Sequence, residues 1–325
     1  MRSEALTRLV RWIGVAATVG MFVVLVMGAT VTNTGSAEGC GRDWPLCHGK
    51  LIPAYTVSTM IEFSHRAVTG VETVLILTLA AGAWLRWRQR REIRYLVPAM
   101  VFFLFLQAGL GAWAVLYPQV AEVLALHFGV SLTAFASVLL TTMFLFEADG
   151  EEALRDRPLA RGLRRLIWGS LAYTYVLVYL GAYVRHTNAG LACLDWPLCQ
   201  SKVVPGFTGP VGIVFIHRLA ALGGGLLLAG LLVWLYHVRA ERPDLYRGGL
   251  VAFTLIVLQA LSGAVVVYAR MDLFSTLLHA GLVALLFGAL SYLCYHTLPR
   301  PALARAPAPA AAPSAAGAVK ATSGS

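Results

Sequence analysis

The segment Asp43-Trp44-Pro45-Leu46-Cys47 occurs a second time, residue for residue, as Asp195-Trp196-Pro197-Leu198-Cys199. The second copy stands 152 residues after the first, and the same offset relates His65-Arg66 to His217-Arg218 and His127 to His279. Other pairs keep this register: Gln107 and Gln259, Gly111 and Gly263, Val115 and Val267, Gly129 and Gly281. The chain therefore contains an internal repeat, and each copy carries two histidines with the same spacing.

The amino-acid composition indicates a membrane protein. Of the 325 residues, 58% are hydrophobic and 13% are charged, whereas a soluble domain has about 25% charged residues. The apolar residues form runs of the roughly 20 residues that cross a bilayer as a helix. Because backbone groups in lipid must be paired within their own segment, we expect helices throughout. Eight spans are predicted, at about 12–31, 60–83, 95–117, 123–146, 166–186, 210–236, 249–269 and 273–295.

The predicted fold is an all-α membrane protein of two tandem four-helix bundles. The N-terminal half comprises residues 1–147, and the C-terminal half comprises residues 165–296. Because each half has an even number of spans, the repeats are expected to be parallel, with a pseudo-two-fold axis along the membrane normal. A cytoplasmic linker, 148–164, joins the halves, and the Pro/Ala-rich tail, 297–325, is predicted to be disordered.

The first apolar run follows three arginines and has some features of a signal peptide. It is closer in length to a full span, and Gly28-Ala29 matches Gly181-Ala182 at an offset of 153. We therefore interpret it as a retained span that belongs to the repeat.

The net charge of +10 has a distribution that argues against a nucleic-acid partner. Most of the 26 basic residues fall before the first span, in the loops after spans 2, 4 and 6, and in the tail. This distribution follows the positive-inside rule, so both termini are predicted to be cytoplasmic. The protein is expected in the cell membrane, with membrane lipid as its surroundings.

Four cysteines lie in the two long loops on the opposite, outer side. Because that side faces the oxidising compartment, we expect the within-loop disulfides Cys40–Cys47 and Cys193–Cys199. A structural role is favoured for Cys193–Cys199, and the first pair is left open between a structural and a redox role. Cys294 is expected to be a lone thiol.

The repeated histidines are the main candidates for a functional site. His65, His127, His217 and His279 all fall near the outer ends of their spans, at similar depth. Two histidines on facing helices can hold one haem iron. Hydrogen-bonded packing histidines are the alternative, and a copper or zinc site is disfavoured because no duplicated carboxylate accompanies each pair. The remaining histidines are interpreted as interfacial: His48, His186, His237 and His296.

Charged residues distinguish the two halves. Glu62 stands three residues before His65, on the same helix face, whereas the matching residue of the second half is Val214. This asymmetry predicts chemistry in the first half and a held cofactor in the second. Arg66 and Arg218 could contact haem propionates or extend to lipid headgroups. Glu72 is interpreted as an interior carboxyl bonded to a neighbouring helix.

The order and spacing of these residues resemble the haem A synthase family of the bacterial and mitochondrial type. The resemblance is carried by the eight spans in two repeats, Glu62-x-x-His65-Arg66, His127, His217-Arg218, His279 and the twin Asp-Trp-Pro-Leu-Cys loops. It covers nearly the whole chain except the tail. The first cysteine loop has one residue more than the second, which puts the reactivity of Cys40–Cys47 in question.

The resemblance implies oxidation of the C8 methyl of haem O to the formyl of haem A, the haem of haem-copper oxidases. His217 and His279 would ligate a haem b cofactor, His65 and His127 would bracket the substrate haem O, and Glu62 would be a catalytic or haem-positioning carboxylate. Either O₂ or water would supply the oxygen. A haem O synthase as donor and oxidase assembly factors would be partners, and a homo-oligomer stays open.

Two other classes of function explain four membrane histidines. A di-haem cytochrome b electron-transfer subunit needs no substrate, but its haems are expected at different depths. A haem carrier or assembly factor would bind haem and pass it on without chemistry. The haems extracted from the purified protein distinguish all three.

Overall fold

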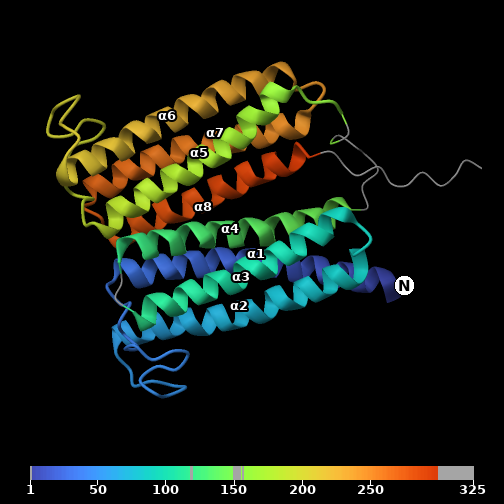
Figure 1. Cartoon of the computed structure of the whole chain (residues 1–325), viewed down its shortest axis with the longest axis horizontal. Helices are drawn as coiled ribbons and strands as arrows, with labels where there is room; N and C mark the ends of the chain where they lie inside the picture. The colour runs from blue at the N-terminus through green and yellow to red at the C-terminus, as the bar shows by residue number, and fades with distance from the viewer. Residues whose placement is uncertain (1, 118–119, 149–154, 156, 299–325) are drawn as a thin grey trace, which may run out of the picture.

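The computed structural model describes residues 2–117, 120–148, 155 and 157–298, and these residues fold as a helical membrane protein (Figure 1). Its helices are long and apolar enough to cross a bilayer, which makes the chain a multi-pass membrane protein. In the described residues they are α1 (Arg2–Asn33), α2 (Val57–Trp87), α3 (Arg91–Leu116), α4 (Ala121–Glu147), α5 (Arg161–His186), α6 (Gly209–His237), α7 (Pro243–Tyr268) and α8 (Leu273–His296). The tail prediction from residue 299 onward and the linker residues 149–154 and 156 lie outside the described residues.

The helices extend beyond the apolar runs at several ends. α1 begins at Arg2 and α5 at Arg161, because charged residues continue the helical hydrogen bonding outside the hydrocarbon layer. Local signals set other ends. Thr56 caps α2 by accepting a hydrogen bond from the Thr59 N–H at 3.2 Å. Asp272 caps α8 by accepting from the Phe274 and Ser275 N–H groups.

The four helices of each half pack against one another in the same pairs. In the first half α1 contacts α2, α2 contacts α3, α3 contacts α4, and α4 closes the bundle against α1. The second half repeats this pattern, with α5 to α8 in the places of α1 to α4. Figure 1 shows the two groups side by side. The symmetry axis along the membrane normal stays a prediction.

The two halves meet along α1, α4, α5 and α8. α4 packs on both α5 and α8, α1 packs on α8, and α4 is the most buried of the eight helices. The apolar core of the first half continues into the second through Ala284 and Phe287 of α8. Because large side chains cross this seam, the halves form one packed body.

The end of the seam near the basic loops contains a buried polar cluster. His296 of α8 contacts Glu147 of α4 through Nε2 at 3.0 Å and Asp244 of α7 through Nδ1 at 3.3 Å. Arg242 donates to both oxygens of the same Asp244 carboxylate. His296 is 6% exposed, so the interfacial position expected from the sequence is wrong for this residue, since acidic side chains on two other helices enclose it.

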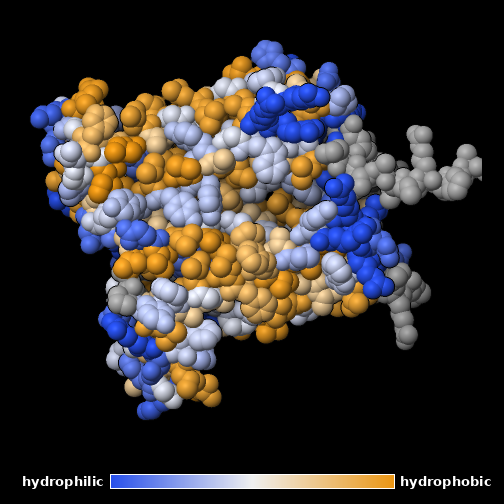
Figure 2. All heavy atoms as spheres, in the orientation of Figure 1, coloured by the Kyte–Doolittle hydropathy of each residue, from blue (hydrophilic) through white to orange (hydrophobic). Residues whose placement is uncertain are grey.

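The surface agrees with a membrane setting. Figure 2 shows hydrophobic residues across the middle of the molecule and hydrophilic residues gathered toward its two ends. The cysteine loops lie at the end of the molecule opposite the N-terminus (Figure 1). Exposed apolar side chains such as Phe105, Leu226 and Val233 are therefore expected to face lipid.

Candidate functional site

One large cavity runs through both bundles at the end that carries the cysteine loops. Its volume is about 1450 Å³, above the range of about 300–1,000 Å³ of pockets that bind one drug-sized molecule. All four repeated histidines line it, together with residues of both cysteine loops, including Trp44 and Trp196. Most other lining residues are apolar. The structure thus places every histidine predicted to be functional in one chamber, large enough for more than one sizeable apolar molecule.

A glycine on a neighbouring helix faces each of these histidine rings. A Cβ atom added at Gly28 would lie 3.5 Å from the His65 ring, and one at Gly181 would lie 3.1 Å from the His217 ring. The same holds on the other helix pair, where Gly111 faces His127 at 3.3 Å and Gly263 faces His279 at 3.4 Å. Glycine lets each ring pack closely against the neighbouring helix, so the four positions are built alike.

Several nitrogen atoms of these rings have no protein partner. The Nδ1 atoms of His65, His127 and His217 are buried and find no hydrogen bond within the described part of the chain. In α8 the corresponding atom of His279 contacts the Ser262 hydroxyl at 2.8 Å. Buried polar atoms are nearly always paired, so these ring nitrogens in the cavity wall suit residues that interact with a bound ligand.

Two glutamines contact the second histidine of each pair. Gln107 Nε2 lies 3.3 Å from His127 Nε2, and Gln259 Nε2 lies 3.1 Å from His279 Nε2. Gln107 also contacts the hydroxyl of Ser131. In the sequence these glutamines stand out only as members of the repeat. Their shared offset with the histidines was the signal that could have assigned them to the site.

These histidines suit a haem iron better than a bare metal ion. Among the described residues no group of three or more His, Cys, Asp or Glu side chains is arranged to hold an ion. A structural or catalytic zinc site needs at least three protein ligands. Haem iron needs only axial ligands, because the macrocycle supplies the others, and histidine is a common one. A pair of histidines in the wall of an apolar chamber therefore fits haem.

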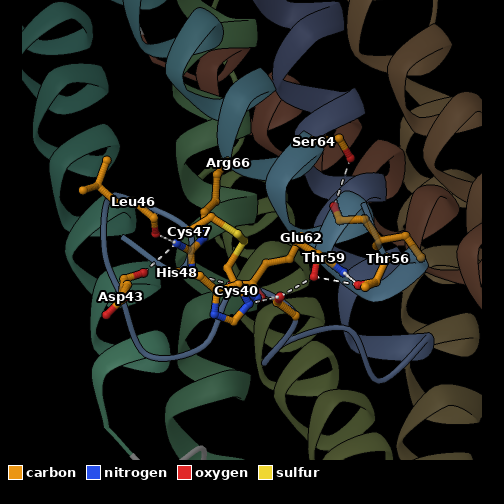
Figure 3. Close-up of a disulfide and its surroundings, with 12 residues drawn as sticks. Cys40, Asp43, Leu46, Cys47, His48, Thr56, Thr59, Glu62, Ser64 and Arg66 are labelled. Atoms are coloured by element: carbon orange, nitrogen blue, oxygen red, sulfur yellow. Dashed lines mark hydrogen bonds and ion pairs between the residues drawn. A yellow bond between two sulfur atoms is a disulfide. The ribbon is translucent and has the colours of Figure 1, made fainter. Parts of the chain in front are cut away.

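The first cysteine loop is held on α2 by a charged pair (Figure 3). The Arg66 guanidinium donates to the carbonyl oxygens of Asp43 and Leu46 at 2.7 and 2.6 Å, and to Glu62 Oε1 at 2.5 Å. The other carboxylate oxygen, Glu62 Oε2, accepts from the Cys40 N–H at 2.8 Å. Glu62 is 3% exposed. The carboxylate and the guanidinium together fix the loop over the mouth of the cavity.

The second cysteine loop is held without a carboxylate. Arg218 donates to the carbonyl oxygens of Asp195 at 2.7 Å, of Leu198, and of Cys193 at 3.2 Å. Val214, the counterpart of Glu62, is buried beside this loop. In the first half a carboxylate links the arginine to the first cysteine, whereas in the second half the arginine reaches that cysteine directly. Neither expectation for the arginines, propionate or headgroup contact, anticipated these backbone bonds.

Asp195 adds an anchor inside the second loop. Its two carboxylate oxygens accept from the backbone N–H groups of Gln200 and Ser201 at 2.8 and 2.7 Å. These bonds, chiefly that from Ser201, hold the pKa of the Asp195 carboxyl below its ordinary value. The anchor is therefore in place at neutral pH and is lost only as the pH falls below the ordinary carboxyl range.

Both expected cysteine pairs lie at disulfide distance. The Cα atoms of Cys40 and Cys47 are 4.5 Å apart, and those of Cys193 and Cys199 are 4.8 Å apart. All four are buried, and Cys294 is a buried free thiol in α8.

Further ionisable residues line the cavity, among them His186 and Glu72. His186 ends α5, where an interfacial position was expected, and it lies in the cavity wall. Glu72 of α2 lies in the same wall and is 3% exposed. The hydrogen bond to a neighbouring helix expected for Glu72 is not formed through Oε1, which has no partner among the residues that the structure describes.

The fold and the cavity define a class: a multi-pass helical membrane protein with one apolar chamber lined by two repeated pairs of histidines. The profile of the cytochrome oxidase assembly protein family matches residues 11–291, and the chain belongs to this family.

Curated relatives cover almost the same part of the chain. A protein of Bacillus licheniformis named "Heme A synthase" is 43% identical over 292 residues, which are 88% of this chain and 95% of that protein. A protein of the same name from Symbiobacterium thermophilum is 44% identical over 298 residues, or 89% and 95% of the two chains. A third, from Bacillus pumilus, is 43% identical over 291 residues, or 87% and 94%.

Proposed function

We propose that the chain is a haem A synthase, an oxidoreductase that converts the C8 methyl of haem O to the formyl group of haem A. The observation that carries the proposal is the cavity, in which two pairs of histidines meet within an apolar chamber. The names of the relatives, which match most of the chain, support the same activity. Haem O carries a farnesyl tail, so an intramembrane chamber suits it as a substrate.

The two halves have different roles in this proposal. His217 and His279 ligate a resident haem b in the C-terminal half, residues 165–296. His65 and His127 bracket the substrate haem O in the N-terminal half, residues 1–147. Bound haem iron supplies redox chemistry that no amino-acid side chain provides. The chain's own contribution is to hold the macrocycles, to seat the histidine rings against the facing glycines, and to exclude water from the apolar wall.

Glu62 lies in the cavity wall three residues before His65, and we propose that it serves the reaction from there. Its two oxygens accept from Arg66 and from the Cys40 N–H, so the carboxylate can act by keeping the loop and the guanidinium at the cavity mouth. Arg66 and Arg218 also line the cavity, where they remain our candidates for propionate contacts.

We further propose that the cysteine loops face the outer side and that the termini are cytoplasmic. The basic loops and the cysteine loops lie at opposite ends of the molecule, as this orientation requires. Haem O would come from a haem O synthase, and oxidase assembly factors would receive the product. Either O₂ or water is compatible with the site as the source of the formyl oxygen, and a homo-oligomer stays open.

The test is co-expression with a source of haem O in a host that makes no haem A, followed by chromatography of the extracted haems. The expected result is haem A together with haem B. Haem B alone would favour a di-haem cytochrome b, and haem O and haem B without haem A would favour a carrier. Either outcome would overturn the proposed function.

The matched variant for this test is Glu62→Gln. It should keep haem B and lose most haem A, by roughly the 10²–10⁴-fold typical of a group that takes part in proton transfer, if the carboxylate serves the chemical step directly. A loss confined to the apparent KM would assign Glu62 to positioning.

A further inference from the structure

Glu72 is a buried carboxyl in the wall of the substrate half that no step above uses. It stands seven residues after His65 on α2, which returns it to nearly the same helix face about 10 Å deeper. It lines the cavity, and its Oε1 atom finds no hydrogen-bond partner among the described residues. An unpartnered buried oxygen is costly, so its presence in a cavity wall indicates a polar group of a ligand.

The Glu72 carboxyl packs directly against α1. It lies against Gly20, where an added Cβ atom would come within 2.0 Å of Glu72 Oε2. Any side chain larger than glycine at position 20 would push the carboxyl out of its place. α1 therefore provides the space in which the carboxyl sits beside the cavity.

In the second half the glycine and the large side chain have exchanged helices, so that α5 carries the side chain and α6 the glycine. The counterpart of Glu72 is Gly224, and the counterpart of Gly20 is Tyr173. A Cβ atom added at Gly224 would lie 3.4 Å from the Tyr173 ring. Packing at this place is thus achieved in the second half by an aromatic ring on α5, without any carboxyl. Since filling the space requires no carboxyl, packing alone does not account for Glu72.

We propose that Glu72 is a specificity-determining residue whose carboxyl binds the hydroxyl group on the farnesyl-bearing substituent of haem O. The inference rests on the proposed function. A hydroxyl donates to a carboxylate and accepts from a carboxylic acid, so the pairing holds in either protonation state. Haem B has a vinyl group at the same ring position and cannot make this bond.

The direction of the substrate agrees with this placement. The propionates of haem O and its farnesyl-bearing substituent lie at opposite edges of the macrocycle. Charged propionates favour the outer mouth, where Arg66 lies and where water is near. The farnesyl edge then points deeper along α2, toward Glu72. Apolar side chains of α1, including Met21, Val24 and Leu25, line the adjoining wall and suit the farnesyl chain.

The test measures the preference for haem O over haem B. Purified full-length protein with its resident haem is titrated with each haem in detergent, and binding is followed by absorbance. The matched variants are Glu72→Met, which keeps a long flexible side chain but bonds weakly, and Glu72→Gln, which keeps a donor and an acceptor. Thr73→Val is the control, because the Thr73 hydroxyl in the same wall already donates to Thr69 O at 2.8 Å.

The wild-type protein and Thr73→Val should prefer haem O, and Glu72→Met should lower that preference by about 3- to 10-fold, the worth of one hydrogen bond. Glu72→Gln should retain most of it. Equal preference in Glu72→Met and the wild-type protein, or an equal loss of affinity for both haems, would overturn the inference. If Glu72→Met does not fold, the same comparison of haem O and haem B binding is made with Glu72→Leu.

Failure of this inference is distinguishable from failure of the proposed function. A wild-type protein that makes no haem A from haem O would refute the function. A wild-type protein that makes haem A, with a Glu72→Met variant that still prefers haem O, would refute only the role of Glu72.

Discussion

Replacing Glu62 with glutamine should loosen the first cysteine loop and leave the second unchanged. The two oxygens of the Glu62 carboxylate accept from two donors, Arg66 Nη2 at 2.5 Å and the Cys40 N–H at 2.8 Å. A glutamine amide has one acceptor oxygen and one NH₂ group that only donates. Whichever way the amide is turned, its NH₂ group faces one of the two donors. One of the two contacts is therefore lost in Glu62→Gln.

The magnitude follows from the loss of that contact. A hydrogen bond to a charged group contributes about 1.5–3 kcal/mol, and a buried donor left without a partner costs about 1–3 kcal/mol. Both figures describe the loss of the same contact, so the closed loop should be destabilised by about 1.5–3 kcal/mol. Because about 1.4 kcal/mol corresponds to tenfold, the open loop should become roughly 10- to 140-fold more populated.

The assay is amide hydrogen exchange followed by mass spectrometry on peptides from both loops. In Glu62→Gln, exchange in the peptide containing Cys40 should accelerate by that factor. The peptide containing Cys193 serves as an internal control, because Val214 occupies the matching position there. Glu38→Gln makes the same change of charge at an exposed position of the first loop and should have little effect. Unchanged exchange in the first loop, or equal acceleration in both loops, would refute the reasoning.

Three further predictions address other parts of the molecule. His279→Ala should remove the low-spin haem B absorbance of the purified protein, whereas His237→Ala, at the exposed end of α6, should keep it. His296→Ala should lower the thermal unfolding temperature, because Glu147 loses a buried partner at a cost of about 1–3 kcal/mol; an unchanged transition in a thermal melt would contradict this. Arg218→Lys should accelerate hydrogen exchange in the second cysteine loop, since an ammonium group cannot reproduce the fork of a guanidinium, and unchanged exchange would argue against the anchor.

The sequence was sufficient to predict the helices and to identify the four histidines that line the cavity. Apolar runs of membrane length leave helix as the only way to pair the backbone, so the eight spans followed from composition and order. The offset of 152 residues related His65 to His217 and His127 to His279, their positions near span ends placed all four at similar depth, and all four line one cavity. Repetition carried this prediction, since one membrane histidine alone is equally compatible with packing.

The partners of long polar side chains could not be predicted in the same way. Arg66 stands next to a candidate ligand, but its bonds go to Asp43 and Leu46, whose carbonyl directions depend on how the loop folds. His296 lies at a span end, where sequence position suggests exposure. Its burial results from Glu147, on another helix 149 residues away. Both cases depend on tertiary contacts that the spacing of residues along one helix does not encode.

The differences between the halves support the proposed assignment of substrate to the first half and cofactor to the second. The halves share their helix pairing, their glycine-faced histidines and their arginine-anchored loops. On this common framework α2 carries two buried carboxyls, Glu62 and Glu72, at positions where α6 has Val214 and Gly224. Burying a carboxyl inside a membrane protein costs free energy unless its polar atoms are paired. Glu62 is paired by the loop, and Glu72, whose Oε1 atom is buried without a partner among the described residues, lies in the cavity wall of the same half. A resident cofactor needs only to be held, whereas a substrate must also be distinguished from its close analogue and released. The polar groups that such selection requires are found in the first half, which is where the proposal places the substrate.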